Sequence, residues 1–134
     1  MENHNIILYV DTENITKKTL EEHSWLGEPR RKGLNKDFTT SVDPGETITW
    51  LGLSVSSPND IVNITSIKHE KGSDLFGRDR LNGDGGYPEQ VIGTVKRKPR
   101  KEESYTLSFT VYNGNNGGKR KGTFKIDPKL QPHR

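Results

Sequence analysis

The chain has 134 residues, of which 28% are hydrophobic and 29% charged, and its 21 basic and 18 acidic side chains give a formal net charge of +3. The absence of cysteine excludes disulfides, thiolate metal centres and cysteine nucleophiles. The length is that of a single domain (1–134), and the small positive excess argues against a dedicated nucleic-acid-binding protein.

No apolar run approaches the roughly 20 residues of a membrane span. The first residues, Met-Glu-Asn-His-Asn, lack the basic and apolar regions of a secretory signal. We therefore expect a cytoplasmic protein.

The first third of the chain contains a short apolar run and several loop signals. Residues 5–11 (Asn-Ile-Ile-Leu-Tyr-Val-Asp) are typical of a central strand that is covered on both faces. Residues 14–23 allow one short helix or an irregular crossover, with Asn14 as a candidate N-cap. We expect an exposed loop at residues 27–36 and a strand at residues 37–42.

A turn and a change of phase mark the next strand. Residues 43–46 (Asp-Pro-Gly-Glu) have type II turn chemistry, because proline suits the second position and glycine the positive φ of the third. Apolar residues then occupy even positions up to Trp50 and odd positions from Leu51 to Val55. This phase change predicts a β-bulge or a strand that changes sheets, and Gly52 would ease either.

Two further strands flank the longest irregular segment. Residues 61–70 predict a strand whose apolar phase differs between Ile64 and Ile67. Residues 71–89 carry five glycines, and loops of this length in a compact domain are usually functional or mobile. Residues 90–97 predict another strand.

Residues 104–112 give the clearest strand signal, because every second residue from Tyr105 to Val111 is apolar. Nine polar, glycine-rich residues follow, and residues 122–127 then alternate again. This pattern predicts a β-hairpin with a long basic tip, closed by the proline of Asp127-Pro128, which cannot donate to the ladder.

These signals together predict an all-β fold. The expected architecture is a single antiparallel, jelly-roll-like β-sandwich of seven or eight strands with at most one short helix. The expected core consists of the alternating apolar residues Ile7, Leu8, Val10, Ile48, Trp50, Leu53, Ile64, Leu107, Phe109, Val111, Phe124 and Ile126.

The loops supply the candidate ligand-binding residues. In the glycine-rich loop, the oxygen-bearing side chains are Asp74, Asp79, Asn82, Asp84 and Tyr87. Calcium and a plain glycine-rich turn are both compatible with this loop; the spacing is not that of an EF-hand, so the turn is favoured and no metal or cofactor is predicted.

The basic residues of the hairpin tip are Lys119, Arg120 and Lys121. With the run at 96–101 they could form an anion-binding patch near one end of the sandwich, although a solvated charged edge that blocks strand pairing is the favoured alternative.

No catalytic constellation is recognisable, and we expect no enzyme. His69 alone among the four histidines lies in a predicted core strand. A blue-copper centre needs a cysteine thiolate, so a surface or hydrogen-bonded His69 is favoured over a metal ligand.

Three landmarks occur in order: residues 7–13 (Ile-Leu-Tyr-Val-Asp-Thr-Glu), 45–50 (Gly-Glu-Thr-Ile-Thr-Trp) and 124–128 (Phe-Lys-Ile-Asp-Pro). With them the chain resembles the bacterial inclusion-body protein family of the PixA and AidA type. The resemblance implies a jelly-roll-like sandwich, no catalytic role, self-association, and expression in bacteria that interact with hosts. Some members are methionine-rich, whereas this chain has one methionine.

The leading hypothesis is therefore a non-catalytic, cytoplasmic bacterial assembly protein that forms homo-oligomers and acts through its surface, on itself or on another protein. The alternative is a ligand-binding module for carbohydrate or an anionic polymer that uses the end loops. Tyr87 and Tyr112 could stack on a sugar in that case.

Overall fold

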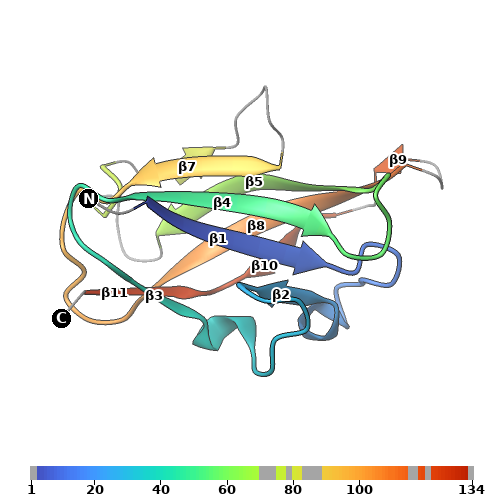
Figure 1. The fold of residues 1–134 in the computed structure, drawn as a ribbon, viewed down its shortest axis with the longest axis horizontal. Helices are drawn as coiled ribbons and strands as arrows, with labels where there is room; N and C mark the ends of the chain where they lie inside the picture. The colour runs from blue at the N-terminus through green and yellow to red at the C-terminus, as the bar shows by residue number, and fades with distance from the viewer. Residues whose placement is uncertain are drawn as a thin grey trace.

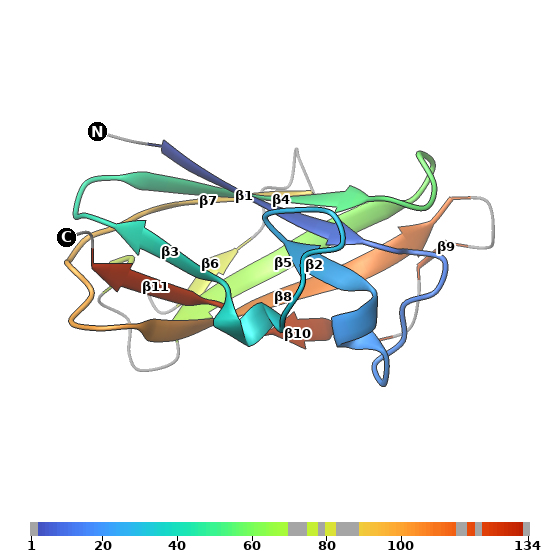
Figure 2. The same cartoon turned by 60° about the horizontal axis from the view of Figure 1, so that its bottom comes forward.

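A computed structural model describes residues 3–69, 75–77, 80–82, 89–114, 118–119 and 122–132. Two β-sheets pack face to face in the described part of the chain, as Figures 1 and 2 show. The four-stranded sheet has the order β2 (Ser24–Leu26), β1 (Asn3–Val10), β4 (Thr47–Ser54) and β7 (Gln90–Thr94). The seven-stranded sheet has the order β3 (Thr39–Val42), β11 (Lys129–Pro132), β8 (Glu103–Asn113), β5 (Ile61–His69) and β6 (Arg80–Asn82), with β9 (Gly118–Lys119) and β10 (Phe124–Ile126) also paired to β8.

The sandwich prediction is confirmed, but the sheets are mixed rather than wholly antiparallel. Of the nine strand pairings between described residues, β1–β4 and β3–β11 are parallel. The sequence could not reveal this, because side chains alternate with a period of two in both kinds of ladder.

Helical structure in the described residues is limited to two 3-10 turns, η1 (Leu20–Glu22) and η2 (Asn35–Asp37). The crossover expected at residues 14–23 contains η1, whose N-cap is Thr19 and not Asn14. The Asn14 amide instead donates to the Asp11 carboxylate (2.9 Å), which holds the turn that follows β1.

The predicted β-bulge at Trp50 is wrong. Strand β4 pairs with β1 without interruption, so Trp50 points into the core and Leu51 points outward. Gly52 is needed for a different reason: a Cβ there would lie 2.6 Å from both Val62 Cγ1 and the Val62 carbonyl oxygen of the facing sheet. The bulge lies in β5 between Ile64 and Ser66, where the apolar phase of the sequence also changes.

Ten of the twelve predicted core residues are buried, and Ile7 and Leu53 are not. Strand β1 alternates, with Ile6 inward and Ile7 half-buried on the outer face, so the strand is not covered equally on both sides. Leu53 is exposed because β4 has no phase change.

Between the sheets, the Trp50 indole N–H donates to the Tyr105 hydroxyl (3.0 Å), and the two rings meet edge to face at 5.6 Å. Complete burial raises the pKa of Tyr105 above its ordinary range.

The predicted turn and hairpin are confirmed. Gly45 has a φ of 91°, and the Glu46 N–H donates to the Asp43 carbonyl oxygen (3.2 Å), as a type II turn requires. Strand β10 pairs antiparallel with β8, placing Phe124 opposite Phe109. After Asp127-Pro128 the chain continues into β11, which the sequence did not indicate.

Candidate functional site

Most of the predicted ligand-binding residues lie outside the part of the chain that the structure describes: Asp74, Asp79, Asp84, Tyr87, Arg120 and Lys121. Asn82 ends strand β6 and is exposed. Lys119 lies in strand β9, which pairs with the end of β8. The glycine-rich loop and the hairpin tip therefore remain predictions.

The sequence left open a basic patch formed jointly by residues 96–101 and Lys119, as the less favoured alternative to a solvated charged edge, and the backbone positions argue against that patch. Residues 96–101 precede the first residue of β8, whereas β9 pairs with Tyr112 and Asn113 at its last residues. Ten steps of a strand at about 3.4 Å separate these ends by about 34 Å. Figure 1 shows the orange loop that precedes β8 and strand β9 at opposite ends of the sandwich. The backbone of Lys119 therefore lies too far from residues 96–101 for the two to form one patch.

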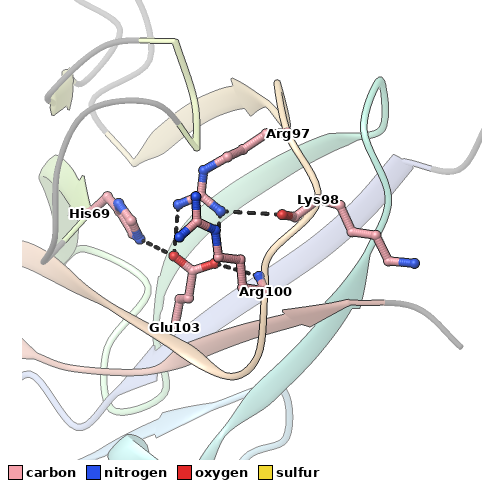
Figure 3. Close-up of polar contacts among 5 residues, drawn as sticks. All are labelled: His69, Arg97, Lys98, Arg100 and Glu103. Atoms are coloured by element: carbon pink, nitrogen blue, oxygen red, sulfur yellow. Dashed lines mark hydrogen bonds and ion pairs between the residues drawn. The ribbon is translucent and has the colours of Figure 1, made fainter.

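A polar cluster organises the loop before β8 (Figure 3). The Glu103 carboxylate accepts two hydrogen bonds from the Arg97 guanidinium (2.9 and 2.8 Å) and one from the Arg100 backbone N–H (3.0 Å). His69 Nε2 lies 2.9 Å from Glu103 Oε1. The Arg97 hydrogen bonds lower the pKa of Glu103 from its ordinary value of 4.5 to about 2.

This cluster explains His69 without a metal. The imidazole is almost completely buried and hydrogen-bonded to a carboxylate, which confirms the structural interpretation of this residue. Among the described residues, no group of three or more histidine, aspartate or glutamate side chains is placed to hold a metal ion.

The cluster also shapes an open groove beside β11. Its lining consists of Lys98, Pro99, Arg100, Lys101, Glu102, Gln131 and Pro132. Lys98, Arg100 and Lys101 are exposed cations of this lining. Among the described lining residues, Glu102 is the one acidic side chain, and the nearby Glu103 is already paired with Arg97. Sequence reasoning identified the basic run but not its neighbour β11.

A second polar network lies at the opposite end of the sandwich. Asp60 accepts hydrogen bonds from the Thr12 hydroxyl (2.6 Å), the Asn113 amide (2.8 Å) and the Gly114 N–H (3.1 Å). Burial would raise the pKa of Asp60, but these hydrogen bonds outweigh it and lower the pKa. The network ties the end of β1 to the start of β5 and the end of β8, so Thr12 of the Asp-Thr landmark has a structural role.

The outer face of the four-stranded sheet carries exposed apolar side chains. Leu51, Leu53 and Ile92 are 36%, 46% and 54% exposed, respectively. Ile7 and Tyr9 of β1 lie directly beside Leu51 and Leu53 of β4, which makes the apolar surface continuous. Sequence reasoning missed this surface because it assigned Leu53 and Ile7 to the core.

The fold and these sites define a class: a mixed two-sheet sandwich that offers an apolar sheet face and an open basic groove. Among the described residues, no helix is long and apolar enough to cross a membrane.

Neither a family model nor a curated protein matches the sequence. Among solved structures, the chain is similar to the crystal structure of the inclusion body protein PixA from Burkholderia cenocepacia, with a TM-score of 0.68 and 14% sequence identity. The similarity covers 98% of this chain and 95% of that one. It confirms at the level of the fold the resemblance that the three sequence landmarks indicate.

Proposed function

We propose that this protein is a non-catalytic bacterial assembly protein that associates with copies of itself, in the manner that the name inclusion body protein suggests for its structural neighbour. The observation that carries the proposal is the fold similarity, which extends over 98% of the chain. We expect such a protein to act in the cytoplasm through contacts made by its surface.

The proposal is tested by sedimentation velocity and small-angle scattering over a concentration series from about 1 μM to 1 mM, the range of ordinary weak to moderate association. The mass is expected to rise above the 15.2 kDa of one chain as concentration increases. A mass that stays at one chain over the whole range would contradict the proposal.

A second candidate function is the binding of an anionic polymer, such as a sulfated polysaccharide, in the groove beside β11. The observation that favours it is the convergence of Lys98, Arg100 and Lys101 on one open groove. The Arg100 backbone N–H donates to Glu103, so the cluster supports the backbone that carries these exposed cations.

Titration with heparin at about 50 and 200 mM salt, beside a glycan array for neutral sugars, tests this candidate. Lys98→Glu combined with Lys101→Glu should weaken heparin binding about tenfold or more, whereas Lys125→Glu on β10 should not. Equal losses of heparin affinity in all variants, or the loss of all heparin binding at moderate salt, would mean that heparin is held by non-specific charge attraction.

A further inference from the structure

The outward side chains of the four-stranded sheet include no charged residue, and at the β2 edge the Arg30 guanidinium of the following loop lies over the Trp25 ring, 5.5 Å from its centroid. Twelve side chains of its strands alternate outward, and the set is Asn3, Asn5, Ile7, Tyr9, Trp25, Thr47, Thr49, Leu51, Leu53, Gln90, Ile92 and Thr94. Trp25 is buried and the other eleven are exposed or half-buried; with 29% of the chain charged, about three of these eleven positions should be charged if the charges were spread evenly. We call these twelve residues the uncharged face.

The size of the uncharged face is that of an interaction surface. Strands β1 and β4 have eight residues each, β7 has five and β2 has three. At about 3.4 Å per residue and about 4.8 Å between strands they cover roughly 400 Å² in projection, before the relief of the side chains is added. The largest apolar patch on a monomer is typically about 300–600 Å² and is often functional, and a standard interface takes about 800 Å² of accessible surface from each partner. The uncharged face is therefore as large as a typical functional patch, and its projected area is about half of what one partner contributes to a standard interface.

We propose, on the basis of the self-association proposed above, that the uncharged face packs against the same face of a second copy across a two-fold axis. Sheets stack on sheets at about 10 Å with their strands nearly aligned, and a second copy brings an identical twisted sheet. The strands of this face offer a strongly charged partner no group of opposite sign, and the nearby Arg30 guanidinium lies at the β2 edge, over Trp25. The net charge of +3 on each copy opposes the contact only weakly.

The centre of the contact is formed by Leu51, Leu53 and Ile92, the three most exposed apolar side chains of the uncharged face. Because both copies use the same surface, the contact closes at a dimer. Assemblies larger than a dimer then need a second, different contact, so the dimer is the building unit of any inclusion.

The competing geometry is pairing at the edge strand β7. The Gly52 N–H donates to the Glu89 carbonyl oxygen and the Val95 N–H to the Glu46 carbonyl oxygen, so odd-numbered residues of β7 bond to β4. The backbone groups of Gln90, Ile92 and Thr94 consequently point away from β4, where another β7 could pair with them. Edge pairing would leave Leu51 and Leu53 exposed, so the uncharged apolar surface favours the face contact.

Four variants separate these geometries. Leu53→Glu and Ile92→Glu place a carboxylate on the uncharged face, and Asn63→Glu places the same charge on the outer face of the other sheet. Thr94→Pro removes an N–H that points away from β4, so it blocks edge pairing. The dimer dissociation constant is measured by sedimentation, and circular dichroism and melting confirm that each variant is folded.

We expect the dissociation constant to rise at least about 100-fold for Leu53→Glu and for Ile92→Glu, because a carboxylate would be buried without a partner. Asn63→Glu should change it by less than about threefold. Thr94 lies at the end of β7, at the margin of the uncharged face, so Thr94→Pro should raise the dissociation constant by less than about tenfold. If Leu53→Glu fails to fold, Ile92→Glu decides, since its side chain is the most exposed of the three.

Two results would overturn the face contact in distinguishable ways. If the unmodified protein associates and both face variants associate equally well, the face assignment is wrong while the proposed function stands; loss of association only in Thr94→Pro would then assign the edge of β7. If the unmodified protein is a monomer at every concentration, self-association itself fails and this contact fails with it.

Discussion

The two outer faces of the sandwich differ although their inner faces are alike. Both sheets direct aliphatic and aromatic side chains inward. The seven-stranded sheet directs hydroxyl and charged groups outward, for example Ser66 and Lys68 of β5, Thr106 of β8 and Lys125 of β10. The uncharged face of the four-stranded sheet directs leucine, isoleucine and tyrosine outward instead.

This difference separates positions whose residue type is set by folding from positions whose residue type reflects an interaction. The inward phase of a strand is set by the core, which needs apolar side chains whatever the protein does. The outward phase is free to vary, so a lack of charge there has a cause other than folding. The two outer faces keep these orientations only while the two sheets stay packed together. We therefore expect the largest losses of stability from changes to the contacts between the sheets.

Asp60→Ala should have the largest effect on stability. The change leaves the Thr12 hydroxyl, the Asn113 amide and the Gly114 N–H without their shared acceptor, which should lower the free energy of unfolding by about 3 kcal/mol. Urea denaturation measures it. Removal of the exposed carboxylate in Glu13→Ala serves as the control, with less than about 0.5 kcal/mol expected. Equal stability of the two variants would show that the Asp60 network does not hold the sheets together.

Gly52→Ala should cost about 2 kcal/mol through overpacking. The added Cβ would meet the Val62 side chain and carbonyl oxygen at 2.6 Å, which forces β4 away from β5. Leu51→Ala on the adjacent outward position is the control and should cost less than half as much. A Gly52→Ala protein with the same melting temperature as the unmodified protein would contradict the close approach of the two sheets.

Glu103→Gln should cost about 1.5 kcal/mol at neutral pH, since it removes a charge-assisted pair with Arg97. The folded-state pKa of Glu103, about 2, lies below its ordinary value of 4.5, so the carboxylate stabilises the fold above pH 4.5. That contribution declines as the pH falls from 4.5 through 2.

The measurement is the difference in unfolding free energy between Glu103→Gln and the unmodified protein at several pH values. The difference should be constant from about pH 5 to 7 and approach zero near pH 2. A difference in unfolding free energy that stays the same between about pH 5 and pH 2 would show that the charge of Glu103 does not stabilise the fold.

Lys68→Ala on the outer face of the seven-stranded sheet should have the smallest effect. The residue is exposed on β5, so its removal should change the unfolding free energy by no more than about 0.5 kcal/mol and leave association unchanged. A clear change in association would mean that the seven-stranded sheet also carries an interface, and the contrast between the faces would lose its meaning.

The sequence predicted the parts of the fold that rest on local patterns. The alternation from Tyr105 to Val111 gave the strand, its buried face and the hairpin with Phe124. The Asp43–Glu46 turn was equally clear, because Gly45 must adopt a positive φ that few other residues tolerate. The candidate loop site was predicted from composition, and most of it lies outside the described residues.

Only the tertiary structure decided which apolar side chains stay exposed. A leucine at position 53 looks the same in sequence whether it faces the core or solvent, and the in-register pairing of β4 with β1 alone assigns it outward. The parallel pairings, the groove beside β11 and the separation of the two basic segments likewise depend on contacts between distant parts of the chain. Local sequence determines the period of a strand, but the partner strands and the facing sheet determine what each side of it contacts.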